Sequence, residues 1–185
     1  MSTKGMNRRQ FLQTSGLTAA GAAAIASGST LMASDGAWAL ELGALDGETG
    51  LTLLKMTRRI YPHETLADMY YAGVVEALDT EAAGDAATAE LLKTGVAALD
   101  GAMGIKWTAL SDGNQLKVLE AISSGPFFQK VRGKAVVALY NNPLVWRHFG
   151  YEGASADFGG YLERGFDDLT WLDSPPADAS PAKAG

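Results

Sequence analysis

The stretch Ala67–Thr80, which reads ADMYYAGVVEALDT, predicts a helix through the spacing of its apolar residues. Tyr70, Val74, Ala77 and Leu78 recur every three to four positions, and this spacing places them along one face of a helix. Elsewhere the chain shows no alternation of apolar and polar residues long enough to predict a strand. An all-α fold is therefore expected.

Apolar spacing of the same kind predicts four more helices, over residues 51–61, 86–103, 112–123 and 126–140. Pro62 should end the first of them, because proline cannot donate to the helical hydrogen-bond ladder. Asp85 and Ser111 precede two others as N-cap residues, and Pro126 suits a first helical turn. In the helix over 112–123 the side chains expected to face inward are Leu116, Leu119, Ala121 and Ile122.

From Pro143 onward the sequence is aromatic and punctuated by glycine, without a sustained period, which predicts an irregular segment. Large rings on irregular backbone are typical of an interface, or of a lid over the protein's own core. Both readings remain open for each ring. The candidate partner-interface residues are Tyr140, Trp146, Arg147, Phe149, Tyr151, Phe158, Tyr161, Phe166 and Trp171.

The expected architecture is a single all-α domain of about five helices over residues 40–172, with the long irregular aromatic segment at its C-terminal end. Residues 40–50 are rich in glycine and acidic side chains and should form an exposed lead-in. Residues 173–185 are rich in Pro, Ala and Ser and should be disordered.

Residues 1–39 resemble a twin-arginine (Tat) export signal. Arg8 and Arg9 are followed by Phe11 and Leu12, then by a run of Ala, Gly, Ser and Thr that is too weakly apolar for a membrane anchor. Ala37 and Ala39 flank Trp38 and supply the small residues of a cleavage site, so that Leu40 would begin the mature chain. Such a signal predicts a cleavable leader and a periplasmic protein that crosses the membrane folded.

The chain has 185 residues, a net charge of −6 and no cysteine. An acidic domain without basic clusters argues against nucleic acid and anionic membrane surfaces as partners. The lack of cysteine excludes disulfides, iron–sulfur ligation and thiol catalysis.

No catalytic, cofactor-binding or metal-binding residue of its own is expected from the sequence. His63 and His148 are the only two histidines, lie far apart and lack ligand spacing. We expect His63 to be a surface or capping group and His148 to be packed or at an interface. Asp167 and Asp168 could suggest calcium, but a single carboxylate pair is more typical of a solvated turn. The sequence contains neither a Gly-x-Ser-x-Gly elbow nor a phosphate-binding glycine loop.

Several short motifs, in this order, resemble the gluconate 2-dehydrogenase subunit 3 family, the small subunit of periplasmic flavoprotein dehydrogenases. The resemblance runs from about Leu51 to Leu172. It is carried by Arg59-Ile60-Tyr61-Pro62, Ala72-Gly73-Val74-Val75-Glu76-Ala77-Leu78-Asp79, Leu110-Ser111 with Gln115, Pro126-Phe127-Phe128, Tyr140-Asn141-Asn142-Pro143, Gly150-Tyr151-Glu152-Gly153 and Gly159-Gly160-Tyr161.

The resemblance implies a non-catalytic subunit that binds a large FAD-containing subunit of the glucose–methanol–choline (GMC) type and carries it out on its own export signal. The large subunit would oxidise a sugar, a sugar acid or an alcohol, and a cytochrome c subunit can accept the electrons. Some related small subunits contain cysteines, whereas this chain has none. Two alternatives are a stand-alone periplasmic helical protein that binds a small ligand, and an independent metalloenzyme built on His63 and His148.

Overall fold

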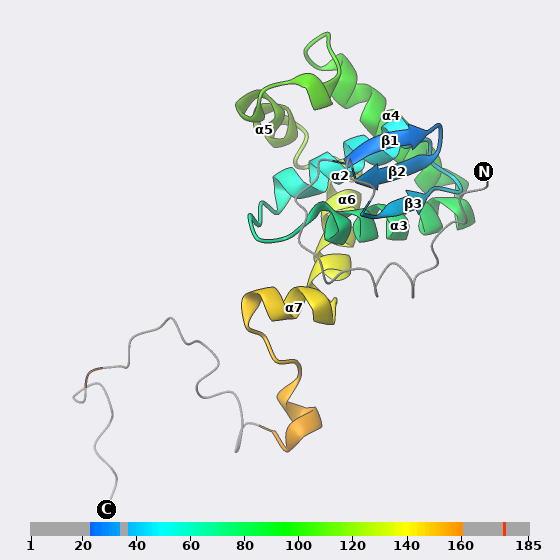
Figure 1. Cartoon of the computed structure of the whole chain (residues 1–185). Coiled ribbons are helices and arrows are strands. Elements are labelled where there is room, and N and C mark those ends of the chain that lie inside the picture. The colour runs from blue at the N-terminus through cyan, green and yellow to red at the C-terminus, as the bar shows by residue number, and fades with distance from the viewer. Residues whose placement is uncertain (1–22, 34–36, 161–175, 177–185) are drawn as a thin grey trace, which may run out of the picture.

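A computed structural model describes residues 23–33, 37–160 and 176 of the chain. In this part the chain is mostly helical, as predicted, with a small sheet in addition (Figure 1). The helices are α2 (Gly47–Ile60), α3 (Asp68–Gly84), α4 (Ala86–Gly101), α5 (Asp112–Ala121), α6 (Pro126–Tyr140) and α7 (Pro143–Phe149), with the short 3-10 helices η1 (Trp107–Ala109) and η2 (Ser155–Phe158). None of the helices within the described ranges is long and apolar enough to cross a membrane.

Helix α3 forms the centre of the bundle and packs against α2, α4 and α6. Val74 and Leu78 are fully buried, as the spacing predicted. The buried face also includes Tyr71 and Val75, whereas Tyr70 is only partly buried. The helix therefore buries a wider stripe than its sequence period indicated, because three helices surround it.

Helix α2 begins at Gly47, four residues before its predicted start. Asp46 caps it, because the Asp46 carboxylate accepts a hydrogen bond from the Thr49 N–H at 2.7 Å. The residues before it are not an exposed lead-in, since Leu42 and Leu45 are buried. The prediction of an exposed lead-in was wrong, because the glycine and acidic residues of this segment form a turn that packs against the helical body.

Three strands precede α2, although no strand was predicted. Strands β1 (Ala23–Ser27), β2 (Thr30–Ala33) and β3 (Ala39–Glu41) form an antiparallel sheet in that order. Leu31 and Ala33, at alternating positions of β2, are fully buried. The strands were missed because they are short and contain few of the β-branched residues, and none of the aromatic residues, that favour strands.

The boundaries of the later helices agree with the sequence within a few residues. Helix α6 has the predicted bounds, and Asp85 caps α4 by accepting hydrogen bonds from the Ala87 and Thr88 N–H groups. The inward face predicted for α5 was partly wrong. Leu119 is buried but Leu116 is 42 % exposed, and Val118 and Gln115 face the interior instead.

The segment after Pro143 is not irregular throughout. It first forms α7, a helix of seven residues, and later the 3-10 helix η2. A helix of only two turns is too short to show a sustained apolar period, so the sequence pattern could not reveal it. Helix α7 and η2 extend away from the helical body, beyond the end of α6 (Figure 1).

Candidate partner interface

Helix α7 is built by residues at its two ends. Asn142 caps its start, since the Asn142 side-chain oxygen accepts a hydrogen bond from the Leu144 N–H at 3.0 Å, and Pro143 occupies the first turn. Gly150 ends it with a left-handed backbone (φ 71°) that glycine adopts without strain. The helix is therefore a defined element, and the chain after it leaves in a fixed direction.

Two residues of α7 fasten it to the end of α6. Val145 is fully buried. The Trp146 indole N–H donates a hydrogen bond to the Tyr140 carbonyl oxygen at the last residue of α6. These contacts satisfy one of the carbonyl groups that a helix end leaves without a partner, so that α7 is a continuation of the core and not a free tail.

His63, Tyr140 and Phe149 form an aromatic cluster where α7 meets the loop after α2. His63 Nε2 and the Tyr140 hydroxyl are 2.6 Å apart, and the rings of His63 and Phe149 meet edge to face at 4.9 Å. Burial lowers the pKa of His63 and raises the pKa of Tyr140. His63 is thus a partly buried member of a ring cluster whose other members the sequence did not indicate.

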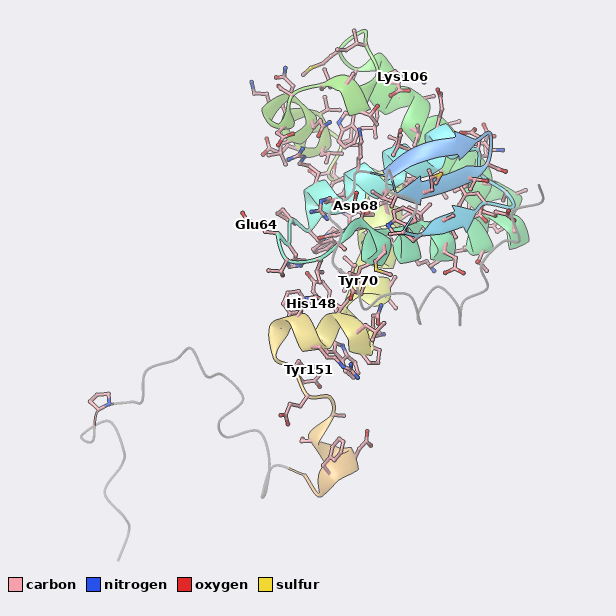
Figure 2. The ribbon with its side chains drawn as sticks, viewed as in Figure 1. Glu64, Asp68, Tyr70, Lys106, His148 and Tyr151 are labelled. Carbon is pink, nitrogen blue, oxygen red and sulfur yellow. The ribbon has the colours of Figure 1, made fainter. Side chains whose placement is uncertain are left out.

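His148 contacts the body at a second point. His148 Nε2 lies 3.1 Å from the Tyr70 hydroxyl, and the two rings meet at 5.3 Å. Figure 2 shows this pair at the junction between α3 and α7. Burial raises the pKa of Tyr70, and the positive charge of Arg147 partly offsets that effect. His148 therefore holds α7 to the body through the Tyr70 hydroxyl group, whereas His63 meets α7 through the Phe149 ring.

Beyond these contacts the segment presents large apolar rings to the solvent. Phe149 is 39 % exposed, Tyr151 is 50 % exposed and Phe158 is 55 % exposed. Tyr151 packs its edge against Trp146, with ring centres 5.2 Å apart, and lies beyond α7 in Figure 2. We call the segment from Pro143 to Phe158 the aromatic arm.

The nine predicted interface residues divide into three groups. Tyr140 and Trp146 are partly buried and join the arm to the body. Arg147, Phe149, Tyr151 and Phe158 are exposed on the arm. Tyr161, Phe166 and Trp171 lie outside the described residues, as do the export-signal residues Arg8, Arg9, Phe11 and Leu12. Five of the predicted residues thus lie on the arm, and Tyr140 lies at the end of α6, where the arm begins.

A polar cavity of about 480 Å³ lies on the body between the end of α2, the following loop and the start of α5. Arg58 pairs with Asp68 at 3.0 Å, and Arg59 pairs with Asp112 and with the Gln115 side-chain oxygen. Lys55 and His63 also line the cavity. Such a lining could hydrogen-bond a small polar molecule. Within residues 23–33, 37–160 and 176, no group of three or more His, Cys, Asp or Glu side chains is placed to hold a metal ion.

Sequence reasoning missed the partners that hold the arm. His63 and Tyr70 are about 80 positions from Phe149 and His148, the α7 residues they meet, and Tyr61 contacts the Tyr140 ring at the end of α6 edge to face at 5.8 Å. No local spacing links such distant positions. The only available signal was composition, because both histidines and most of these tyrosines flank helix ends.

Comparisons with protein-family models, with curated proteins and with solved structures give no match to this chain.

Proposed function

We propose that this protein is a non-catalytic small subunit and export escort of a periplasmic FAD-dependent dehydrogenase of the GMC type. Its large partner oxidises a sugar, a sugar acid or an alcohol, holds the FAD, and crosses the membrane by the twin-arginine route on the signal of this chain. A cytochrome c subunit is a further candidate member of the complex. The protein is thereby assigned to the family that its motifs resemble, and its location is the periplasm.

The exposed rings of the aromatic arm are the observation that carries this proposal. Phe149, Tyr151 and Phe158 present apolar surface on a segment that leaves the body, with Arg147 exposed beside them. Aromatic and arginine side chains dominate the binding energy of protein interfaces, and truncating a central one commonly costs about 2 kcal/mol or more. Exposed apolar rings of this kind often mark a surface that a protein partner buries, and we infer such a partner here.

The way in which the arm is anchored supports the same conclusion. Val145 is buried, Trp146 is bonded to the end of α6, and His63 and Tyr70 hold the two sides of α7. A segment that is already ordered loses less conformational entropy on binding, so it binds more tightly for the same contact area. The arm therefore has the properties of a preorganised binding element.

The positions of the family-like motifs give further support. Arg59 belongs to the first of them and Gln115 to the third, and the Arg59 side chain donates two hydrogen bonds to the Gln115 side-chain oxygen, at 3.1 and 2.9 Å. Gln115 in turn bonds the backbone of the fully buried Trp107. Residues of two of the resembling motifs thus contact each other within one structural unit.

Co-purification tests the proposal. The tagged chain is expressed together with the neighbouring reading frames of its own gene, and the periplasmic fraction is purified through the tag. We expect a large second chain with the absorbance of bound flavin. Recovery of the tagged protein alone would contradict the proposal.

Matched variants locate the interface. A Tyr151→Ser, Phe158→Ser double variant should lose the flavin-bearing chain while the free subunit stays folded. The control is an Ile105→Ser, Val137→Ser double variant, which removes apolar side chains that are similarly exposed (53 % and 56 %) but lie on the body. It should retain the partner.

A second candidate function is a stand-alone protein that binds a small polar molecule. The polar cavity beside Arg58 and Arg59 favours it. Native mass spectrometry of the periplasmic protein separates the two functions, because this one predicts a monomer with a small bound mass and the first predicts a complex.

A further inference from the structure

The bond that the sequence predicts as the cleavage site, Ala39–Leu40, lies in β3, the edge strand of the sheet. Ala39 pairs with Met32 and Leu40 pairs with Leu31, so that both sides of the bond belong to the ladder between β2 and β3. Ala33 N–H donates a hydrogen bond to the Trp38 carbonyl at 3.0 Å one step further along. In the folded chain this bond is therefore not in an accessible loop.

The hairpin of β1 and β2, residues 23–33, is also fixed to the helical body. The Leu42 N–H donates to the Ser29 carbonyl at 2.8 Å, and the Gly47 N–H at the start of α2 donates to the Gly28 carbonyl at 2.6 Å. Leu31 is fully buried in the common core. The hairpin thus covers the first turns of α2 and belongs to the same core as the helices (Figure 1).

Gly50 shows that α2 is shaped to receive this hairpin. A Cβ atom at Gly50 would come within 2.5 Å of Leu42 Cδ1 and 3.1 Å of Leu31 Cδ1. Glycine inside a helix is unfavourable relative to alanine. Its presence in α2 is explained by the close approach of two side chains, Leu42 first and then Leu31, which lies on the leader side of the cleavage site.

Folding and cleavage at Ala39 therefore compete. A protease acts on a folded chain through the fraction of molecules in which the bond has opened, and a bond inside a sheet that is joined to the core opens rarely. On the twin-arginine route the chain folds before it reaches the periplasmic face of the membrane, where signal peptidase acts. The shielding requires that the sheet has formed by the time the peptidase meets the chain.

We propose that residues 23–33 are a permanent part of the domain, and that the folded sheet shields the Ala39–Leu40 bond so that the exported protein keeps the segment before Leu40. The inference rests on the proposed function only for its export route. The shielding itself depends on contacts within this chain.

The first test determines the N-terminus of the exported protein. The full chain with a C-terminal tag is produced in cells that have the twin-arginine system, and the mass of the intact exported protein is measured. We expect the wild-type protein to retain residues 23–39. A wild-type protein that begins at Leu40 would overturn the proposal.

A matched pair of variants tests the cause without changing the signal. Gly50→Leu should displace the hairpin from α2 and yield a chain that begins at Leu40. Gly73→Leu is the control, since a Cβ at this helical position in α3 meets nothing within 4 Å, and it should behave as the wild type. A Gly50→Leu protein that is exported with residues 23–39 still attached would count against the shielding.

The second test needs no export. Two samples of purified full-length protein are incubated with detergent-solubilised signal peptidase. One is kept folded in buffer, and the other is unfolded in urea and diluted into the assay immediately before the measurement. Cleavage at Ala39 should be at least about tenfold slower for the folded protein. Equal rates would overturn the shielding even if export is normal. If the folded chain resists cleavage in this assay but cells do not export it, the shielding is still supported. The export route in the proposed function would then be wrong.

Discussion

Gln115 joins three parts of the bundle through one buried side chain. Its amide N–H donates to the Trp107 carbonyl at 3.2 Å, and its oxygen accepts from Arg59. The Trp107 indole returns a hydrogen bond to the Gln115 carbonyl at 3.3 Å. Because every polar group of this pair has a partner, η1 and α5 are held against α2 without a cost for burying polar atoms.

We expect Gln115→Leu to destabilise the protein by roughly 1–2 kcal/mol, because the Trp107 carbonyl would keep only the Leu110 N–H and the partly buried Arg59 guanidinium only Asp112. Urea unfolding followed by tryptophan fluorescence measures this. Gln129→Leu is the control, since the Gln129 side chain bonds Ser123 at an exposed site. Equal effects of the two substitutions would contradict the role given to Gln115.

Asp79 holds the turn between β3 and α2. Its carboxylate accepts hydrogen bonds from the backbone N–H groups of Gly43, Ala44 and Leu45, at 2.8, 2.9 and 2.9 Å. Asp79→Asn places an N–H₂ group against backbone donors and should cost about 2 kcal/mol. Hydrogen exchange should then speed up at these three amides. Asp112→Asn, which removes an exposed ion pair with Arg59, should cost less than about 1 kcal/mol and leave their exchange unchanged.

Asp85 and Asp79 show which contacts of a single residue can be predicted from sequence and which cannot. Asp85 was predicted as a cap because a cap acts on the N–H groups two and three positions ahead. Asp79 acts on residues 34 to 36 positions away, and in sequence it resembles any polar residue near the end of a helix. A short-range rule identifies the first and has no means of identifying the second.

At the scale of elements the same division appears. Helix α6 has the predicted bounds because Pro126 marks its start and its apolar period extends over four turns. The strands β1 to β3 are three to five residues long, and the sheet is stabilised by packing on α2. Local sequence patterns therefore do not predict them. The aromatic arm was predicted as a set of candidate rings, but the tyrosines and histidines that anchor it come from helices far away in sequence.

The docking of α7 should depend on pH through His63. Burial lowers the pKa of His63 below its ordinary value of 6.5, so the unfolded chain takes up a proton at a higher pH than the folded chain does. The stability is therefore unaffected by His63 at a pH above the pKa of His63 in the unfolded chain. It decreases as the pH falls below that pKa towards the lower pKa of His63 in the folded chain.

We therefore expect the free energy of unfolding of the wild type to fall, relative to that of His63→Gln, as the pH decreases below the ordinary histidine pKa of 6.5. Glutamine keeps a hydrogen-bonding group beside Tyr140 but does not titrate. His148→Gln retains His63 and should follow the wild type. Parallel curves for the wild type and His63→Gln would show that His63 does not link the arm to pH.

At the scale of the whole molecule, the two ends of the described chain serve different purposes. The N-terminal hairpin closes the core over α2, whereas the arm leaves the body and carries exposed rings (Figure 1). The first adds to stability, and the second leaves apolar area uncovered, which is unfavourable until a partner buries it. Substitutions in the hairpin should therefore affect folding, and substitutions in the arm should affect assembly.

A truncation series tests the contribution of the hairpin directly. Leu31 and Trp38 are almost completely buried, and burial of each such side chain contributes roughly 1.5–3 kcal/mol. A chain that starts at Leu40 loses both and uncovers the side of α2 beside Gly50, so its free energy of unfolding should be lower by on the order of 3–6 kcal/mol than that of a chain that starts at Ala23. Urea unfolding of the two chains measures the difference, and because both lack residues 1–22, the comparison isolates the sheet. Equal unfolding midpoints would mean that the helical body is complete from Leu40 onward, and that cleavage after Ala39 leaves its stability unchanged.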